Sequence, residues 1–238
     1  MESKDVFFEQ IRSGGCLSYL LGCEKEKVCV VIDPEIDKTE EYLRMVQEGS
    51  FRLLYAIDTH THADHMSACK VLQSRSGAKV VMHRASDAPY VDVKVDEGDM
   101  LQCGEVLIQI LHTPGHTEDS ACLLVGDRLF TGDTLLVGGC GRTDLPGGNA
   151  EKQYWSLKRI ASLDDKLLVF PAHDYRPVFA TLGEEKKTNP RIKLIVTKDE
   201  FIHFMTSRRP PLPRKFQSAI EWNRSPLQGT QRGMGEGI

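Results

Sequence analysis

The stretch "THTHADH" (residues 59–65) places four side chains that commonly bind metals within a few positions of one another: His60, His62, Asp64 and His65. It continues the apolar run "LLYAIDTH" (53–60), whose composition predicts a buried strand. Loops that follow rigid strands are where binding sites are commonly built, because the sheet fixes their geometry. The stretch therefore predicts a metal site at the end of a strand.

Ligand-type side chains recur downstream wherever a predicted strand ends. His116 follows "VLIQILHTPG" (106–115), Asp133 follows "RLFTG" (128–132), and His173 follows "KLLVFPA" (166–172). Each motif alone would be interpreted as a turn, since Gly, Pro and Asp are the usual turn residues. Because four such residues or clusters follow strands in series, we expect them to meet at one edge of a sheet. The remaining histidines, His83, His112 and His203, are expected to be structural.

The residue types leave the metal and its reaction open. His60 and His62 can point the same way from an extended segment, whereas Asp64 and His65 are expected at the start of a helix and leave in another direction. One loop can thus serve two neighbouring metal positions. The absence of a cysteine from the cluster argues against a closed thiolate-rich zinc site. Two histidines with one carboxylate suit a non-haem Fe(II) oxygenase, and the same ligand types suit a zinc hydrolase.

Length and composition indicate one large globular domain of 238 residues. The net charge of −4 argues against a dedicated nucleic-acid binder, and the basic stretch "RRPPLPRK" (208–215) is short and broken by proline. No run approaches the roughly 18 apolar residues of a membrane span, and the first residues lack the apolar stretch of a secretory signal. Seven scattered cysteines without a C-x-x-C pair predict reduced thiols and a cytoplasmic location.

The pattern along the chain predicts strands mixed with helices. Apolar runs at 15–22 and 27–34 predict buried strands, and short strands fill the middle of the chain. A helix is expected over 37–49, capped by Asp37 and ended by Gly49, and another over 63–77. A third is expected over 150–163, with Tyr154, Leu157, Ile160 and Leu163 at helical spacing. Residues 166–175 are expected to be the final strand, followed by helices and loops.

The series H-x-H-x-D-H, "TPGHT" with His116, "TGD" with Asp133 and "PAHDY" with His173 resembles the signature of the metallo-β-lactamase superfamily over about residues 10–180. The resemblance implies an α+β fold, a four-layer αββα sandwich with two mixed sheets face to face and the metal at one edge. It divides the chain into a catalytic domain, residues 1–190, and a short C-terminal extension, residues 191–238, whose last ~10 residues are expected to be disordered.

Two glutathione-linked families of that superfamily share the full series. The glyoxalase II hydrolases cleave a thioester with two metal ions, whereas the persulfide dioxygenases related to the ethylmalonic encephalopathy protein use one iron. The stretches "GDTLLVGGCGRTD" (132–144) and "PAHDYRPVFATLGEEKKTNPRI" (171–192) resemble the second family. The short C-terminus is also similar, because glyoxalase II enzymes typically carry a longer helical domain.

The resemblance to the dioxygenases implies oxidation of glutathione persulfide by O2 to sulfite and glutathione at one Fe(II) per chain. His60, His116 and Asp133 would be the iron ligands. A supporting shell, or a vacant second metal site, would consist of His62, Asp64, His65 and His173. Arg142 and Tyr175 would contact the substrate, with an ion pair between Arg142 and Asp144 or Asp174 as the alternative.

The main alternative function is that of a glyoxalase II-like hydrolase with two Zn, Fe or Mn ions. Asp64, His65 and His173 would then hold the second ion, and Asp133 would bridge the two. A thiol or metal sensor without catalytic activity fits less well, because the ligand set is intact and open. The dioxygenase interpretation also implies a sulfurtransferase of the rhodanese type as a pathway partner and leaves a homodimer open, with no nucleic-acid or membrane partner.

Overall fold

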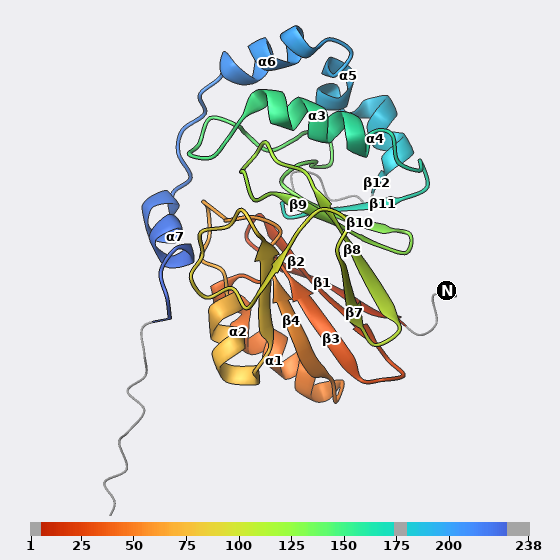
Figure 1. Cartoon of the computed structure of the whole chain (residues 1–238), viewed down its shortest axis with the longest axis vertical. Coiled ribbons are helices and arrows are strands. Elements are labelled where there is room, and N and C mark those ends of the chain that lie inside the picture. Colours follow the sequence, from red (N-terminus) through yellow and green to blue (C-terminus); the bar gives the residue numbers. More distant parts are fainter. Residues whose placement is uncertain (1–5, 174–179, 228–238) are drawn as a thin grey trace, which may run out of the picture.

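The computed structural model describes residues 6–173 and 180–227. The chain forms four layers, in which two six-stranded sheets pack face to face and helices cover both outer faces (Figure 1). Helices α1 (Thr39–Glu48) and α2 (Cys69–Ser76) cover the first sheet, and α3 (Ala150–Ile160) covers the second. The expected αββα sandwich is therefore confirmed. Tyr175 and the C-terminal tail lie outside the described residues.

The first sheet has the order β1-β2-β3-β4-β5-β6. Its first three strands are antiparallel, and β3 to β6 run parallel, with α1 and α2 as the connections after β3 and β4. The strands are β1 (Val6–Ser13), β2 (Cys16–Cys23), β3 (Val28–Ile32), β4 (Arg52–Ile57), β5 (Lys79–His83) and β6 (Val93–Val95).

The second sheet has the order β12-β11-β10-β9-β8-β7. All its pairs are antiparallel except β10 with β11, which are parallel because α3 returns the chain between them. The strands are β7 (Met100–Cys103), β8 (Val106–His112), β9 (Ala121–Val125), β10 (Arg128–Gly132), β11 (Leu168–Pro171) and β12 (Ala180–Thr181).

The core between the sheets contains a group of aromatic rings from both of them. Tyr19 of β2 packs against Phe130 of β10 and Phe170 of β11, with centroids 5.1 and 5.6 Å away. The Tyr19 hydroxyl donates a hydrogen bond of 2.6 Å to the carbonyl oxygen of Pro171, the last residue of β11. This bond ties the first sheet to the strand end that carries His173.

The C-terminal helices fall into two places. Helices α4 (Leu182–Thr188), α5 (Pro190–Leu194) and α6 (Lys198–Thr206) lie on the side of α3, where Phe201 is fully buried against Tyr154 and its neighbours. Helix α7 (Phe216–Asn223) lies apart from them, on the side of α2 (Figure 1). Within the described residues, no helix is long and apolar enough to span a membrane.

Three sequence-based expectations about the elements are wrong in detail. Asp37 makes no side-chain cap: it lies in the 3₁₀ turn η2 (Ile36–Lys38), and α1 begins at Thr39. Helix α2 begins at Cys69, not at residue 63, because the amide of Ala68 donates to the carbonyl of Pro34 and holds the preceding residues in a loop. Asp64 and His65 are therefore loop residues. Strand β11 is not final, since β12 pairs with it.

The interlayer bond of Tyr19 gives a stability prediction. Tyr19→Phe leaves the buried Pro171 carbonyl without its donor and should lower the free energy of unfolding by about 1–3 kcal/mol. Tyr55→Phe is the matched control, because the half-buried Tyr55 hydroxyl has no hydrogen bond among the described residues. Its effect should stay within about 0.5 kcal/mol. Urea unfolding of the three proteins measures both values, and equal losses in the two variants would contradict the assignment.

Candidate metal centre

The strand-end residues converge, as their positions in the sequence predict. The loop after β4 carries His60 to His65, and His116, Asp133 and His173 follow β8, β10 and β11. Their potential ligand atoms sort into groups whose members all lie within 4.8 Å of one another. In the described part of the chain the groups are His60, His116 and Asp133; Cys16, Asp64, His65 and His173; and Asp33, Asp58 and His62.

In the first group, hydrogen bonds orient both buried imidazole rings. Nδ1 of His60 donates to Oγ1 of Thr59 at 2.9 Å, since that hydroxyl gives its own proton to Asp33 at 3.0 Å. Nδ1 of His116 donates to the carbonyl oxygen of Arg142 at 2.7 Å. Both Nε2 atoms are thereby left as acceptors, and Nε2 of His60 has no hydrogen-bond partner in the described structure. An unpartnered buried nitrogen in this orientation suits a metal ion.

Two glycines allow these side chains to approach so closely. A Cβ atom on Gly132, which has a φ of +50°, would lie 2.5 Å from Oγ1 of Thr59. A Cβ atom on Gly141 would lie 2.4 Å from the carbonyl oxygen of Asp133 and 2.8 Å from Nδ1 of His116. The "TGD" and "GCGRTD" motifs are therefore partly steric requirements of the first group.

In the first group, His60 and Asp133 have the protonation states that a metal ion requires of its ligands. Burial lowers the pKa of His60 to about 3, so the ring is neutral at neutral pH. Burial favours the neutral form of Asp133, but the charge of His173 and its hydrogen bond hold the pKa of that carboxyl below its usual value. A cation binding here meets a neutral His60 nitrogen and an ionised carboxylate, which is the state that metal binding requires.

His173 joins the first group to the second. Its Nδ1 lies 2.6 Å from Oδ1 of Asp133, and its Nε2 lies 2.8 Å from Oδ2 of Asp64. The same Asp64 oxygen lies 3.1 Å from Nδ1 of His65 and accepts from Cys16 Sγ at 3.4 Å. The imidazole of His173 therefore stands between two carboxylates.

The histidines of the second group favour the charged form. Burial opposes a charge on His173, but the Asp133 carboxylate and the hydrogen bonds to Asp133 and Asp64 raise its pKa well above the usual value. Burial likewise opposes a charge on His65, yet its hydrogen bonds to Asp64 and Cys16 raise its pKa to about 10. Both rings are thus protonated at neutral pH, in contrast to the neutral His60.

His62 belongs to the third group. Its Nε2 lies 3.1 Å from Oδ1 of Asp33 and 3.7 Å from Oδ1 of Asp58. Burial lowers the pKa of His62 and raises that of Asp33, and it raises the pKa of Asp58 to about 7. The contact is therefore a hydrogen bond between groups driven toward neutrality, not an ion pair. Nδ1 of His62 has no partner within the described ranges.

Sequence reasoning missed four residues that build this centre: Cys16, Asp33, Asp58 and Asp119. Asp33 and Asp58 follow the ends of β3 and β4, in "VVIDP" and "AIDTH", which is the signal that identified the other acids. Asp119 holds the loop by accepting from the amide and the hydroxyl of Thr61 at 3.1 and 2.6 Å. Cys16 follows the β1–β2 turn, and no local pattern indicates a role for it.

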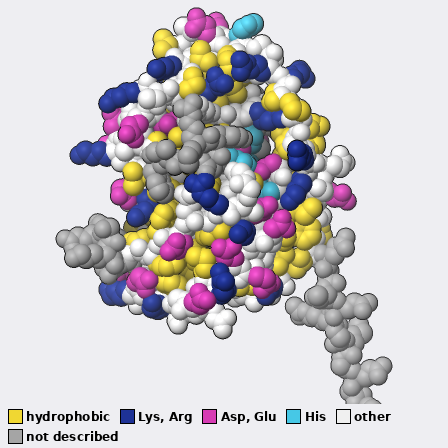
Figure 2. Space-filling model, turned by 180° about the vertical axis from the view of Figure 1, so that it is seen from behind, with side chains coloured by type: hydrophobic (Ala, Val, Ile, Leu, Met, Phe, Trp, Pro, Cys, Tyr) yellow, Lys and Arg dark blue, Asp and Glu magenta, His cyan; other side chains and the backbone are white. Residues whose placement is uncertain are grey.

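A cavity of about 720 Å³ opens onto the first two groups and is lined by Cys16, Asp64, His116, Asp133 and His173. On the face opposite to that of Figure 1, histidine side chains reach the surface near the middle, next to acidic side chains and flanked by Lys and Arg (Figure 2). The centre is thus accessible from one side of the sandwich.

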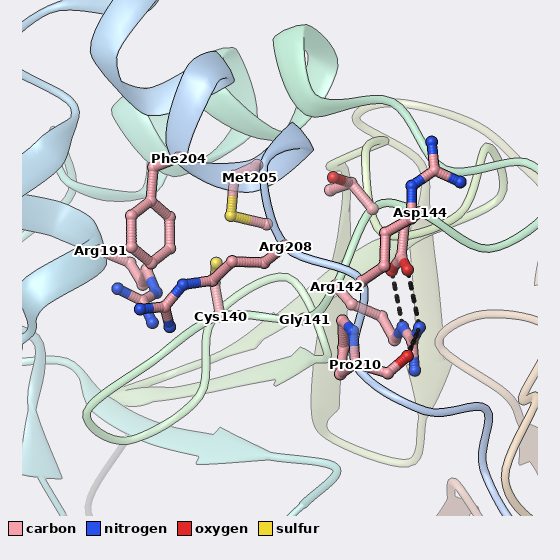
Figure 3. A pocket seen from close by; sticks show the side chains of 11 residues that line it. Cys140, Gly141, Arg142, Asp144, Arg191, Phe204, Met205, Arg208 and Pro210 are labelled. Atoms are coloured by element: carbon pink, nitrogen blue, oxygen red, sulfur yellow. Dashed lines mark hydrogen bonds and ion pairs between the residues drawn. The ribbon is translucent and has the colours of Figure 1, made fainter.

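Arg142 lies at the rim of this cavity, but its guanidinium is engaged. It binds both carboxylate oxygens of Asp144 at 2.7 Å and donates to the carbonyl oxygens of Pro210 and Pro211 at 2.8 Å (Figure 3). This is the ion pair that the sequence left as an alternative to substrate contact. Arg142 also orients His116 through its own carbonyl oxygen.

A second pocket of about 430 Å³ adjoins the cavity, with Cys140, Arg142 and Arg191 in both walls. We call it the arginine pocket. Arg191 and Arg208 lie against the ring of Phe204, with their guanidinium carbons 4.0 and 4.5 Å from its centroid (Figure 3). Neither guanidinium forms an ion pair among the residues that the structure describes. The arginine pocket therefore offers positive charge to an anionic ligand.

Comparison with known proteins agrees with the fold. The sequence model of the Metallo-beta-lactamase superfamily matches residues 11–173. The mitochondrial persulfide dioxygenase ETHE1 of Bos taurus is 36% identical over 211 residues, which cover 87% of this chain and 82% of that protein. The crystal structure of ETHE1 from Myxococcus xanthus has a TM-score of 0.87 and 40% identity, covering 92% of this chain and 98% of that one.

A third similarity concerns the number of metal ions. The crystal structure of TTHA1623 in a di-iron-bound form is 30% identical, with a TM-score of 0.64, and covers 77% of this chain and 98% of that one. The identity and the covered share of this chain are nevertheless higher for the two ETHE1 relatives. The chain therefore belongs to the persulfide dioxygenase family within the metallo-beta-lactamase superfamily.

Proposed function

We propose that this protein oxidises glutathione persulfide with O2 and water to sulfite and glutathione at a single Fe(II). The proposal is carried by the group of His60, His116 and Asp133, two histidines and one carboxylate, in a member of the persulfide dioxygenase family. The protonation of the two neighbouring ligand groups supports a single ion. His60 is neutral and Asp133 ionised in the first group, whereas His65 and His173 hold protons in the second. The first group can therefore bind a cation, whereas the second group already carries positive charge on its histidines.

The first group fits iron by its chemistry. His60, His116 and Asp133 form the two-histidine, one-carboxylate set that binds non-haem Fe(II) and leaves positions open. When bound there, Fe(II) supplies the oxygen chemistry that side chains cannot perform. The protein's part is to orient the rings through Thr59 and the Arg142 carbonyl and to keep Asp133 ionised. His62, Asp64, His65 and His173 then form the supporting shell.

The arginine pocket supports an anionic thiol as the substrate. Glutathione carries two carboxylates at a distance from its sulfur, and the cavity at the first group continues into the arginine pocket. We place the carboxylates at Arg191 and Arg208 and the persulfide sulfur at the cavity beside His116 and Asp133. Arg142 then supports the pocket wall, since its guanidinium is bound to Asp144. A substrate contact by Tyr175 stays a prediction, because that residue lies outside the described ranges.

The alternative is a thioester hydrolase with two metal ions. It is favoured by the second group, in which Asp64, His65 and His173 lie together and His173 contacts Asp133, and by the di-iron form of TTHA1623. An oxygen electrode with metal analysis separates the two functions. The proposal predicts about one iron per chain and O2 uptake that depends on glutathione persulfide. Two metals per chain and thioester cleavage without O2 would contradict it.

The proposal extends to the pathway partner, the oligomeric state, the compartment and the division into domains. A rhodanese-type sulfurtransferase would supply or consume the sulfur species, and a homodimer stays open. We expect a reducing, cytoplasmic environment, because all seven cysteines are free in the structure. The Bos taurus relative is mitochondrial by name, so the compartment of this chain remains a prediction. So does the division between a domain of residues 1–190 and an extension of residues 191–238.

Single substitutions should affect the metal unequally. His116→Ala removes a ligand and should reduce bound iron to below about a tenth of an equivalent. His173→Ala should keep about one equivalent at saturating iron while turnover falls about 10- to 100-fold, because only the support of Asp133 is lost. Metal analysis after gel filtration measures both. Equal metal loss in the two variants would instead favour the binuclear hydrolase.

The raised pKa of His65 predicts how a second ion depends on pH. Below about pH 10 this ring is protonated, so a second cation must displace its proton, and binding should tighten as the pH is raised toward 10. Equilibrium dialysis against Zn²⁺ between pH 6 and pH 9.5 should show one tight equivalent throughout and a second one that strengthens with pH. Two equivalents of equal affinity at pH 7 would refute this picture.

The arginine pocket predicts an effect on KM. Arg191→Ala and Arg208→Ala should each raise KM for glutathione persulfide about tenfold with little change in kcat, because a charge-assisted hydrogen bond to the substrate is lost. Arg44→Ala, an exposed residue of α1, is the control and should leave both constants unchanged. Loss of kcat at constant KM would place the arginines outside the binding site.

A further inference from the structure

The ligand loop is held by a side chain that lies more than 150 positions away in the sequence. Asn223, the last residue of α7, is 2% exposed. Its Nδ2 donates to the carbonyl oxygens of His62 and His65, each at 2.9 Å, and its Oδ1 accepts from the amide of Ser67, also at 2.9 Å. The amide side chain thus makes three hydrogen bonds, all of them to the loop.

Two further side chains, one on α7 and one on α2, strengthen the contact between α7 and the loop. Nε1 of Trp222 donates to the carbonyl oxygen of Ser67 at 2.8 Å. In return, the buried ammonium of Lys70, at the start of α2, donates to the carbonyl oxygens of Trp222 and Ser225 at 2.8 and 3.0 Å. It also lies 3.7 Å from the centre of the Trp222 ring. A buried cation needs such partners, and the carbonyl groups at a helix C-terminus are well placed to provide them.

The loop needs these bonds because it is irregular. Residues 61–68 form neither helix nor strand, yet most of them are buried, so their peptide groups must find partners outside regular structure. The carbonyl groups of His62 and His65 flank Ala63 and Asp64. Fixing both carbonyl groups fixes the direction in which the Asp64 carboxylate leaves the backbone. That carboxylate accepts from His173, which in turn contacts Asp133.

We infer that Asn223 is a positioning residue of the metal centre, and that α7 serves to hold the ligand loop. Its influence reaches the first group through the loop, Asp64 and His173, without contact to the metal or the substrate. The inference rests on the metal site of the proposed function, but not on its reaction. It also assigns to the C-terminal extension a structural function, holding the ligand loop, that its sequence does not indicate.

The test compares substitutions in the metal-loaded, full-length protein. Asn223→Ala removes all three bonds, and Trp222→Phe removes one while it keeps a ring beside Lys70. Glu221→Ala is the matched surface control on the same helix, because Glu221 is exposed. Phe201→Leu, in the core of α6, is a control for lost stability far from the loop. For each protein we would measure Tm, the rate at which EDTA removes Co²⁺, the visible spectrum of the Co²⁺ form, and kcat and KM.

Asn223→Ala should release Co²⁺ about 10- to 100-fold faster, with an altered Co²⁺ spectrum and a loss in kcat larger than any change in KM. Trp222→Phe should shift the same readouts less, and Glu221→Ala not at all. Phe201→Leu should lower Tm without changing the spectrum or the release rate. The inference is overturned if Asn223→Ala and Trp222→Phe release Co²⁺ within about twofold of the unsubstituted protein. It is equally overturned if Phe201→Leu accelerates release as much as they do.

The Co²⁺ readouts separate this inference from the proposed function. If the unsubstituted protein shows no persulfide-dependent O2 uptake, the proposed reaction fails, while the release rates and the spectrum still decide the role of Asn223.

Discussion

The His173 imidazole bridges Asp133 and Asp64, and the charges of the centre depend on this interaction. Two buried carboxylates in one cavity repel each other and need positive charge between them. His173 provides it, with contacts of 2.6 and 2.8 Å, and its pKa is raised accordingly. Asp133 stays ionised as a result and can serve as the carboxylate of the first group. Asp64 is occupied by the same interaction.

This division gives the seven potential ligands of the superfamily pattern different tasks. His60 is desolvated and neutral, and the hydroxyl of Thr59 fixes its ring. His62 is turned toward Asp33 and Asp58, where burial suppresses the charges of all three. The H-x-H-x-D-H motif and the residues around it thus form one group whose protonation suits a cation, and beside it groups whose members are hydrogen-bonded to one another. Under the proposed function, the hydrogen-bonded groups beside the first group would keep the centre mononuclear and leave coordination positions for substrate.

The sandwich brings these residues together because strand ends from both sheets meet at one edge. The bond from Tyr19 to the Pro171 carbonyl sets the distance between the first sheet and the strand that precedes His173. Gly132 and Gly141 allow backbone and rings to approach where any side chain would collide. Helix α7 completes the arrangement from outside, through Asn223 and the loop. The centre therefore depends on parts of the chain far from the ligand motifs.

Much of this was predictable from the sequence, and the remainder has identifiable physical reasons. The resemblance to the metallo-β-lactamase superfamily implied the layers of the fold. The convergence of His60, His116, Asp133 and His173 was predicted from their positions at strand ends, which are local patterns. The resemblance also implied the first group and placed Asp64, His65 and His173 together, whereas the third group was missed because it depends on the orientation of the His62 ring. The late start of α2 was missed because Ala68 bonds to Pro34, a contact between distant segments. Asn223 was missed for the same reason.

The most direct test of the account is anomalous diffraction at the iron edge from crystals of the iron-loaded protein at neutral pH. If the first group holds a single iron, there will be one peak per chain, next to Nε2 of His60, Nε2 of His116 and the carboxylate of Asp133, with His173 still between Asp133 and Asp64. A second peak of similar height among Asp64, His65 and His173 would contradict it.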